Sequence, residues 1–149
     1  MIEGVLLKEL KKFADQRGTV MHMLRSDAPF FEQFGEVYFS TVNPGVIKGW
    51  KKHLRMTQHF AVPVGNVRVV IYDDRPDSST TGLTQEFEIG TRRYCLLRIP
   101  PLVWYSLGNV GGESAMLANC TDIPHDPEEV RVTDLSDQSI PYTWDIQSK

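Results

Sequence analysis

Three side chains capable of proton transfer or charge stabilisation, Lys51, His53 and Tyr105, provide the main chemical signal of this 149-residue sequence. Lys51 and His53 are two positions apart in a strand-like stretch, and alternate residues of a strand point to the same face. An imidazole is the natural general base near neutral pH, an ammonium stabilises developing negative charge, and a phenol can donate a proton. This combination predicts acid–base chemistry that runs on side chains.

The spacing around these residues matches the metal-binding frame of cupin barrels, although most ligands are replaced. The frame runs glycine, His-x-His, glutamate, glycine, and the chain fills those places with Gly45, Lys51, His53, Gln58 and Gly65. The histidine of the second cupin motif is replaced by Tyr105. Only His53 keeps its ligand, and an ammonium, an amide and a phenol bind transition metals poorly. We therefore expect a site with no metal and no cofactor.

Short strand-like segments must position these side chains. Runs rich in Val, Ile, Phe, Tyr and Thr, separated by turn residues, cover 35–43, 59–64, 66–74, 84–89, 93–99 and 114–120. Strands of this length and spacing predict an all-β fold, and a closed barrel removes exposed strand edges. We expect a cupin-type double-stranded β-helix, or jelly-roll barrel, as a single domain over residues 1–149.

Three further segments carry expectations of their own. Gly65-Asn66 lies between two strand-like runs and predicts a tight hairpin, because Gly and Asn tolerate positive φ angles. Residues 8–16 fit either a short helix or an edge strand. The segment after Asp122 is rich in Pro, Asp and Glu, and we expect it to pack over the barrel mouth or on a neighbouring subunit.

Composition and charge narrow the range of partners. The net charge is −3, and Lys and Arg are scattered without a basic stripe, which argues against nucleic acid. No apolar run approaches the ~20 residues of a membrane span, which argues against a membrane partner. The N-terminus, MIEGVLLKELKKF, lacks the basic region and long apolar core of a signal peptide, so we expect a cytoplasmic protein.

Several motifs resemble those of the dTDP-4-dehydrorhamnose 3,5-epimerase family. They are Asp15-Gln16-Arg17-Gly18, Gly45-Val46-Ile47-Lys48-Gly49, the run from Asp74 to Gly82, Ile99-Pro100 and Cys120-Thr121-Asp122. The Asp-Arg-x-x-Ser-x-Thr-x-Gly run is the most specific, since no general folding rule requires it. The resemblance implies a metal-free cupin that acts on a nucleotide-linked 4-keto-6-deoxy sugar in deoxysugar or lipopolysaccharide biosynthesis, and a homodimer.

The chain departs from that family at its catalytic positions. The family's base falls here on Trp50 or Lys51, its tyrosine acid on Ala118, and its lysine on Gln58. The spacing from Gly49 to Gln58 is instead similar to that of the sister group of dTDP-sugar 3,4-ketoisomerases, which carry a His-x-His pair there. Lys51 replaces the first histidine even in that comparison. The resemblance thus identifies a substrate class and leaves the reaction open.

On such a substrate, the chemical residues suit enolate formation. A proton is removed next to the ketone, the enolate is stabilised, and a proton is returned. His53 is the expected base, Tyr105 the proton donor and Lys51 the cation near the enolate oxygen. Lys51 could instead serve as the base if burial favoured its neutral form.

The expected substrate contacts surround this centre. They are Arg17, Lys48 and Arg75 for the diphosphate, Trp104 for the sugar or the base, and Gln58 and Asn119. Each candidate also has a purely structural interpretation, such as a solvated lysine, a barrel-filling aromatic ring or an arginine paired with a neighbouring aspartate.

We expect an epimerase acting at carbons adjacent to the ketone, with two alternatives. The Gly49-to-Gln58 spacing favours a 3,4-ketoisomerase. The absence of the family's acid at Ala118 and of its lysine at Gln58 favours a sugar-binding cupin without catalysis.

Overall fold

The computed structural model describes residues 1–145, and nearly all of the regular structure in that range is β-strand. The elements are β1 (Leu6–Glu9), β2 (Lys12–Asp15), β3 (Gly18–Met21), β4 (Glu36–Val42), β5 (Ile47–His53), β6 (Gln58–Val64), β7 (Asn66–Tyr72), β8 (Thr84–Gly90), β9 (Cys95–Ile99), β10 (Trp104–Asn109), β11 (Ala115–Thr121), the 3-10 turn η1 (Pro127–Glu129) and β12 (Val130–Val132). The all-β prediction is confirmed, and each of the six predicted runs contains a strand. Residues 8–16 form strands rather than a helix. Within the described residues, no helix is long and apolar enough to cross a membrane.

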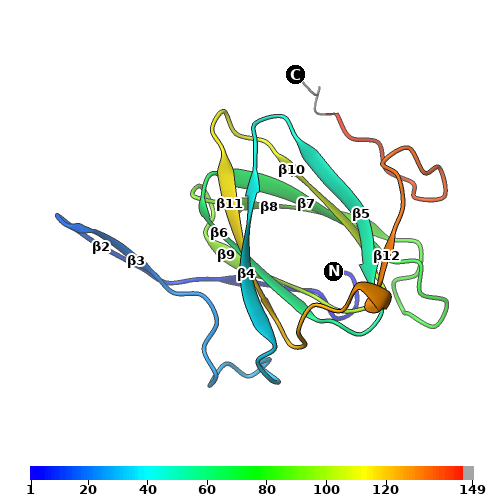
Figure 1. The fold of residues 1–149 in the computed structure, drawn as a ribbon, viewed down its shortest axis with the longest axis horizontal. Helices are drawn as coiled ribbons and strands as arrows, with labels where there is room; N and C mark the ends of the chain where they lie inside the picture. The colour runs from blue at the N-terminus through cyan, green and yellow to red at the C-terminus, as the bar shows by residue number, and fades with distance from the viewer. Residues whose placement is uncertain (146–149) are drawn as a thin grey trace.

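Two five-stranded antiparallel sheets face each other and form a jelly-roll barrel (Figure 1). Their strand orders are β1-β9-β6-β11-β4 and β12-β5-β10-β7-β8. Alternate residues of each sheet point inward, so Val62 and Leu97 of the first sheet share a buried apolar cluster with Val69 and Ile89 of the second. The site described below borders this core and shares Phe60, Tyr105, Leu107 and Leu117 with it.

The turn at Gly65 corrects one sequence prediction. A tight hairpin would pair β6 with β7, but these strands belong to different sheets. Gly65 is instead a corner at which the chain crosses from one sheet to the other. Its φ angle is +81°, and a Cβ at this position would lie 2.6 Å from the Ala115 Cα. Glycine is therefore required by both conformation and space.

Two segments lie outside the barrel. The hairpin of β2 and β3 projects away from it (Figure 1), with Phe13 and Val20 paired and largely exposed. The C-terminal tail pairs β12 with β5 and then packs Ile140 and Trp144 against the outer face of the second sheet. The tail thus covers mainly a sheet face, whereas we expected it at the barrel mouth or on a neighbouring subunit.

Candidate active site

Strands β5 and β10 place the three predicted catalytic side chains together on the inner face of the second sheet. Tyr105 pairs with Lys51, and Ser106 pairs with Gly49 after a bulge in the ladder. The strands approach so closely here that a Cβ on Gly49 would lie 2.5 Å from the Ser106 Cβ. This close contact fixes the register, and the alternation of the strand then turns Lys51 and Tyr105 inward.

His53 forms a buried pair with Glu129, a residue that the sequence analysis did not identify. The Glu129 Oε1 contacts the His53 Nδ1, and Oε2 accepts hydrogen bonds from the backbone N–H groups of Arg55 (3.1 Å) and Met56 (3.2 Å). Burial acts to raise the pKa of Glu129, but the hydrogen bonds from His53 and the two backbone groups outweigh it and hold the pKa below its usual value.

The charged carboxylate determines which imidazole nitrogen can act as a base. Glu129 accepts a hydrogen bond from the protonated His53 Nδ1, which leaves the lone pair of Nε2 free in the neutral ring. Nε2 lies 3.4 Å from the Tyr105 hydroxyl, and the two rings are nearly parallel. Burial raises the pKa of Tyr105 well above its usual value, so the phenol stays protonated. The pair therefore presents a base and a hydroxyl side by side.

The first sheet supplies a row of polar side chains opposite this pair. Gln58 of β6 accepts hydrogen bonds through Oε1 from the Tyr105 hydroxyl (3.2 Å) and from the Asn119 Nδ2 (3.0 Å). The Asn119 Nδ2 also lies 2.8 Å from the hydroxyl of Tyr38, to which it donates. A row of polar side chains in mutual contact thus runs between the two sheets from Glu129 to Tyr38. Tyr38 is the second site residue that the sequence analysis missed.

A pocket of about 80 Å³ opens between the two sheets at this row. It is lined by Tyr38, Ser40, Lys48, Gly49, Lys51, Gln58, Phe60, Tyr105, Leu107, Leu117 and Asn119. Because one water needs roughly 10–15 Å³ by this measure, the pocket has room for the reacting part of a sugar ring but not for a nucleotide. Ala118 is not among the lining residues, since it alternates with Asn119 along β11.

The two lysines of the pocket differ in their bonding. The Lys48 Nζ donates to the Ser40 Oγ (2.9 Å) and to the Thr41 carbonyl oxygen (2.7 Å). Lys51 has no hydrogen-bond acceptor or carboxylate partner among residues 1–145, so its charge is available to a ligand. This places an uncommitted cation in the pocket that Tyr105 also lines.

Three predicted substrate-binding residues lie elsewhere. Arg17 is at the tip of the projecting hairpin and forms an ion pair with Asp15 at 2.7 Å. Arg75 donates to the buried Asp73 (2.8 Å) and to the Glu3 carbonyl oxygen (2.7 Å). Trp104 points to the outer face of the second sheet. The structure therefore brings together Lys48, Lys51, His53, Gln58, Tyr105 and Asn119, but not these three.

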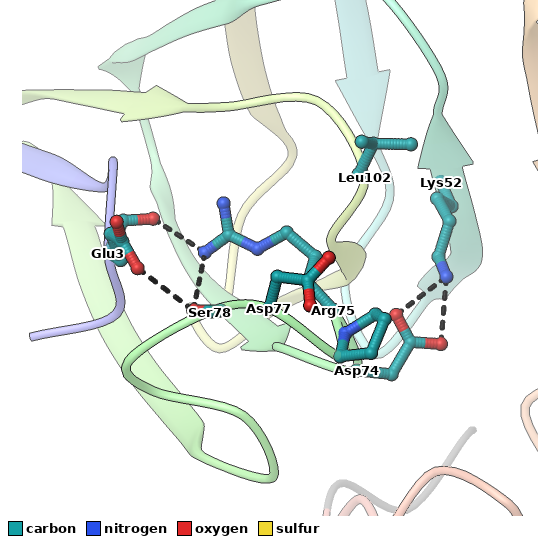
Figure 2. A pocket seen from close by; sticks show the side chains of 8 residues that line it. Glu3, Lys52, Asp74, Arg75, Asp77, Ser78 and Leu102 are labelled. Carbon is teal, nitrogen blue, oxygen red and sulfur yellow. Dashed lines mark hydrogen bonds and ion pairs between the residues drawn. The ribbon is translucent and has the colours of Figure 1, made fainter.

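A larger hollow of about 410 Å³ lies on the outer surface near Arg75 (Figure 2). Lys52 and Arg75 are its cations, and both are already occupied. The Lys52 Nζ contacts both carboxylate oxygens of Asp74, at 2.6 and 2.7 Å, and Figure 2 shows Arg75 turned toward Glu3 and Ser78. We regard the smaller inner pocket as the candidate active site. Lys51 and Tyr105 line it, and His53 lies beside it, with its Nε2 3.4 Å from the Tyr105 hydroxyl.

The side chains at the four cupin ligand positions make a poor set of metal ligands. The four positions of the cupin frame hold an ammonium, an imidazole, an amide and a phenol. Within residues 1–145, no three side chains of His, Cys, Asp or Glu come together as a metal site would require. With its own side chains, the site can take a proton at the His53 Nε2, next to Tyr105, and stabilise a developing oxyanion with Lys51 and Tyr105.

Comparison with known sequences supports a specific family. A model of the dTDP-4-dehydrorhamnose 3,5-epimerase family matches residues 1–149. The chain is 36% identical over 143 residues to the probable low-salt glycan biosynthesis epimerase Agl13 of Haloferax volcanii, covering 95% of this chain and 88% of that protein. It is 33% identical over 150 residues to the spore coat polysaccharide biosynthesis protein SpsL of Bacillus subtilis, covering 99% of both chains.

Solved structures agree with this assignment. A dTDP sugar isomerase from Desulfovibrio desulfuricans superposes with a TM-score of 0.94 at 48% identity, covering 96% of this chain and 92% of that one. ChmJ, a 3'-monoepimerase from Streptomyces bikiniensis, shares the fold with a TM-score of 0.86 at 17% identity, covering 99% of this chain and 79% of that one. The chain belongs to the dTDP-4-dehydrorhamnose 3,5-epimerase family.

Proposed function

We propose that this enzyme epimerises a dTDP-linked 4-keto-6-deoxy sugar at a carbon next to the ketone, in the biosynthesis of a glycan. The observation that carries the proposal is the buried His53–Glu129 pair, whose Nε2 lies 3.4 Å from the hydroxyl of Tyr105. Tyr105 in turn lines a pocket that Lys51 also lines. A hydrogen on carbon next to a ketone becomes removable once a base and a stabiliser of the enolate oxygen act together. The relatives named for glycan and polysaccharide biosynthesis support the setting.

The proposed reaction begins at His53. The Nε2 takes the proton from the carbon, the electron pair of that C–H bond forms a carbon–carbon double bond, and the carbonyl becomes an enolate oxygen. Glu129 stabilises the imidazolium that results. Lys51 and the hydroxyl of Tyr105 stabilise the enolate oxygen, and they need little rearrangement because they already line the pocket.

The size of the pocket determines which part of the substrate it can hold. The sugar ring occupies the pocket, and the diphosphate and nucleoside remain outside its mouth, where Lys48 is the nearest predicted phosphate contact. The hairpin that carries Arg17 projects away from its own barrel (Figure 1), so we assign Arg17 to the diphosphate bound by a second copy of the chain. A homodimer that brings the hairpin to a partner's pocket is therefore part of the proposal. The cytoplasmic location stays a prediction.

A 3,4-ketoisomerase is the second candidate, and one observation favours it. His53 and Tyr105 lie on the same sheet with Nε2 and the hydroxyl 3.4 Å apart, so both would meet the same face of a sugar. Such a pair can move a proton between neighbouring atoms on one face without inverting a carbon. The related structure described as a dTDP sugar isomerase is compatible with either reaction.

Proton NMR in deuterated buffer with dTDP-4-keto-6-deoxyglucose tests the proposal. An epimerase incorporates deuterium at a carbon flanking the ketone and changes the ring couplings at that carbon, while the ketone stays in place. An isomerase moves the ketone to the neighbouring carbon. Nucleotide-sugar binding without exchange would contradict both reactions on this substrate.

A further inference from the structure

Tyr38 lines the pocket and has no role in the reaction proposed above. It lies on β4 and is 36% exposed, so its ring stands between the pocket and solvent. β4 pairs with β11 in the first sheet, and Tyr38 is directly opposite Asn119. His53 and Tyr105 belong to the second sheet. A sugar ring held in the pocket between the two sheets would therefore have the second sheet, with Tyr105 and the adjoining His53, on one side and Tyr38 on the other.

Epimerisation requires groups on both sides of the ring. A proton returned from the side on which it was removed restores the original configuration, so the new proton must come from the opposite side. Tyr105 is poorly placed for this step, because its hydroxyl lies 3.4 Å from the very nitrogen that takes the proton. Ala118 cannot donate a proton, and it does not line the pocket. Among the hydroxyls of the facing sheet, that of Tyr38 is the acidic one.

The hydrogen bonding of Tyr38 leaves its own proton available. The hydroxyl oxygen accepts from the Asn119 Nδ2 at 2.8 Å, and no acceptor for the hydroxyl proton lies within hydrogen-bond distance in the part of the chain that the structure describes. Burial raises the pKa of Tyr38 and outweighs the hydrogen bond from Asn119, so the hydroxyl is protonated at neutral pH. The Asn119 Nδ2 also donates to the Gln58 Oε1 at 3.0 Å, which fixes the orientation of the Asn119 amide. The amide in turn holds the Tyr38 oxygen in place relative to Gln58.

We propose that Tyr38 is a catalytic residue of this epimerase, the proton donor on the face of the sugar opposite His53. This inference rests on the proposed function. The Tyr38 O–H bond breaks as the new C–H bond forms, the electrons of the enolate restore the C=O bond, and the phenolate accepts the hydrogen bond of Asn119. Solvent then returns a proton to Tyr38 through its exposed edge, and His53 releases the proton it took. The reaction is balanced without a further reactant.

The test separates proton removal from inversion. Wild type, Tyr38→Phe and a control, Tyr72→Phe, are incubated with dTDP-4-keto-6-deoxyglucose in deuterated buffer and followed by proton NMR. Tyr72 lies on the outer face of the second sheet, so its variant removes a hydroxyl outside the pocket. We expect Tyr38→Phe to form the epimer about 100-fold more slowly, while deuterium still enters the unepimerised substrate within about threefold of the wild-type rate. Tyr72→Phe should match wild type in both rates.

The possible failures are distinguishable. Epimer formation by Tyr38→Phe within about threefold of wild type would overturn the role of Tyr38 and leave the proposed function intact. A parallel loss of exchange and epimerisation would also overturn it, since a donor on the second face is not needed for proton removal. If wild type itself neither exchanges nor epimerises this substrate, the proposed function fails and the inference fails with it.

Discussion

The two faces of strands β5 and β10 are made from alternating residues of the same short segments, yet one face lines a pocket and the other packs against the C-terminal tail. On the inner face, Lys51 and Tyr105 line a pocket, and His53 contacts the hydroxyl of Tyr105. On the outer face, the Lys52 Nζ lies 4.8 Å from the centre of the Trp104 ring, and the Trp104 Nε1 donates to Asp74 at 3.1 Å. The C-terminal tail covers much of this second face. Substitutions on the inner face should therefore affect turnover, and those on the outer face should affect stability.

The largest effect should come from His53→Asn. Loss of the base is expected to lower turnover by about 10²–10⁴-fold. The free energy of unfolding should fall by less than about 2 kcal/mol, because Glu129 keeps its two backbone hydrogen-bond donors. Steady-state kinetics and thermal unfolding check both values, with His125→Asn, an exposed histidine, as the control. Turnover within a few-fold of wild type would remove His53 from the mechanism.

Glu129→Gln should have the next largest effect on turnover. The amide can donate to Nδ1 and hold the proton on Nε2, which is the wrong tautomer for a base, so we expect a loss of about 10²-fold or more. Steady-state kinetics measure the loss. Glu128→Gln changes the exposed neighbour on the same turn and should leave turnover unchanged. Turnover by Glu129→Gln within a few-fold of wild type would show that Glu129 has only a structural role.

On the outer face, Ile140→Ala should reduce stability and spare catalysis. Ile140 is 3% exposed and packs in the cluster with Trp50 and Val70. Truncation of such a side chain typically costs about 2–5 kcal/mol of unfolding free energy. Denaturant unfolding measures that loss, and turnover per folded molecule should equal that of wild type. Leu135→Ala alters a more exposed leucine of the same tail and should cost much less.

The smallest effect is expected for Trp104→Phe. The change removes the hydrogen bond to Asp74, for about 1 kcal/mol of stability, and keeps an aromatic ring beside Lys52. Because Trp104 does not line the inner pocket, KM and kcat should stay within about twofold of wild type. A tenfold rise in KM would show that the substrate extends to the outer face, and the functional contrast between the two faces would be lost.

The sequence was informative wherever strand alternation decides the outcome. Lys51 and His53 share a face because they are two positions apart, and the cupin spacing placed Gln58 and Tyr105 beside them. The same rule excludes some of the predicted contacts from the sequence alone. Trp104 is adjacent to Tyr105, so the two side chains of one regular strand cannot both face the pocket. Ala118 and Asn119 are related in the same way.

The residues that the sequence could not supply depend on tertiary arrangement. Glu129 lies 76 positions from His53 and reaches it only because β12 pairs with the edge of β5. Tyr38 enters the site because the sheet containing β4 faces the sheet containing β5, which no local pattern encodes. Gly65 was correctly identified as a turn, but whether a turn returns within a sheet or crosses to another depends on how both sheets close.

The position of η1 in the chain sets an order of assembly. Glu129 follows β1 to β11 in sequence, so during synthesis the strands of the pocket emerge before the carboxylate that orients the base. A nascent chain that ends before η1 contains every strand that lines the pocket but lacks that partner for His53. Competence for proton abstraction is therefore acquired late, when the segment that closes the edge of β5 has docked.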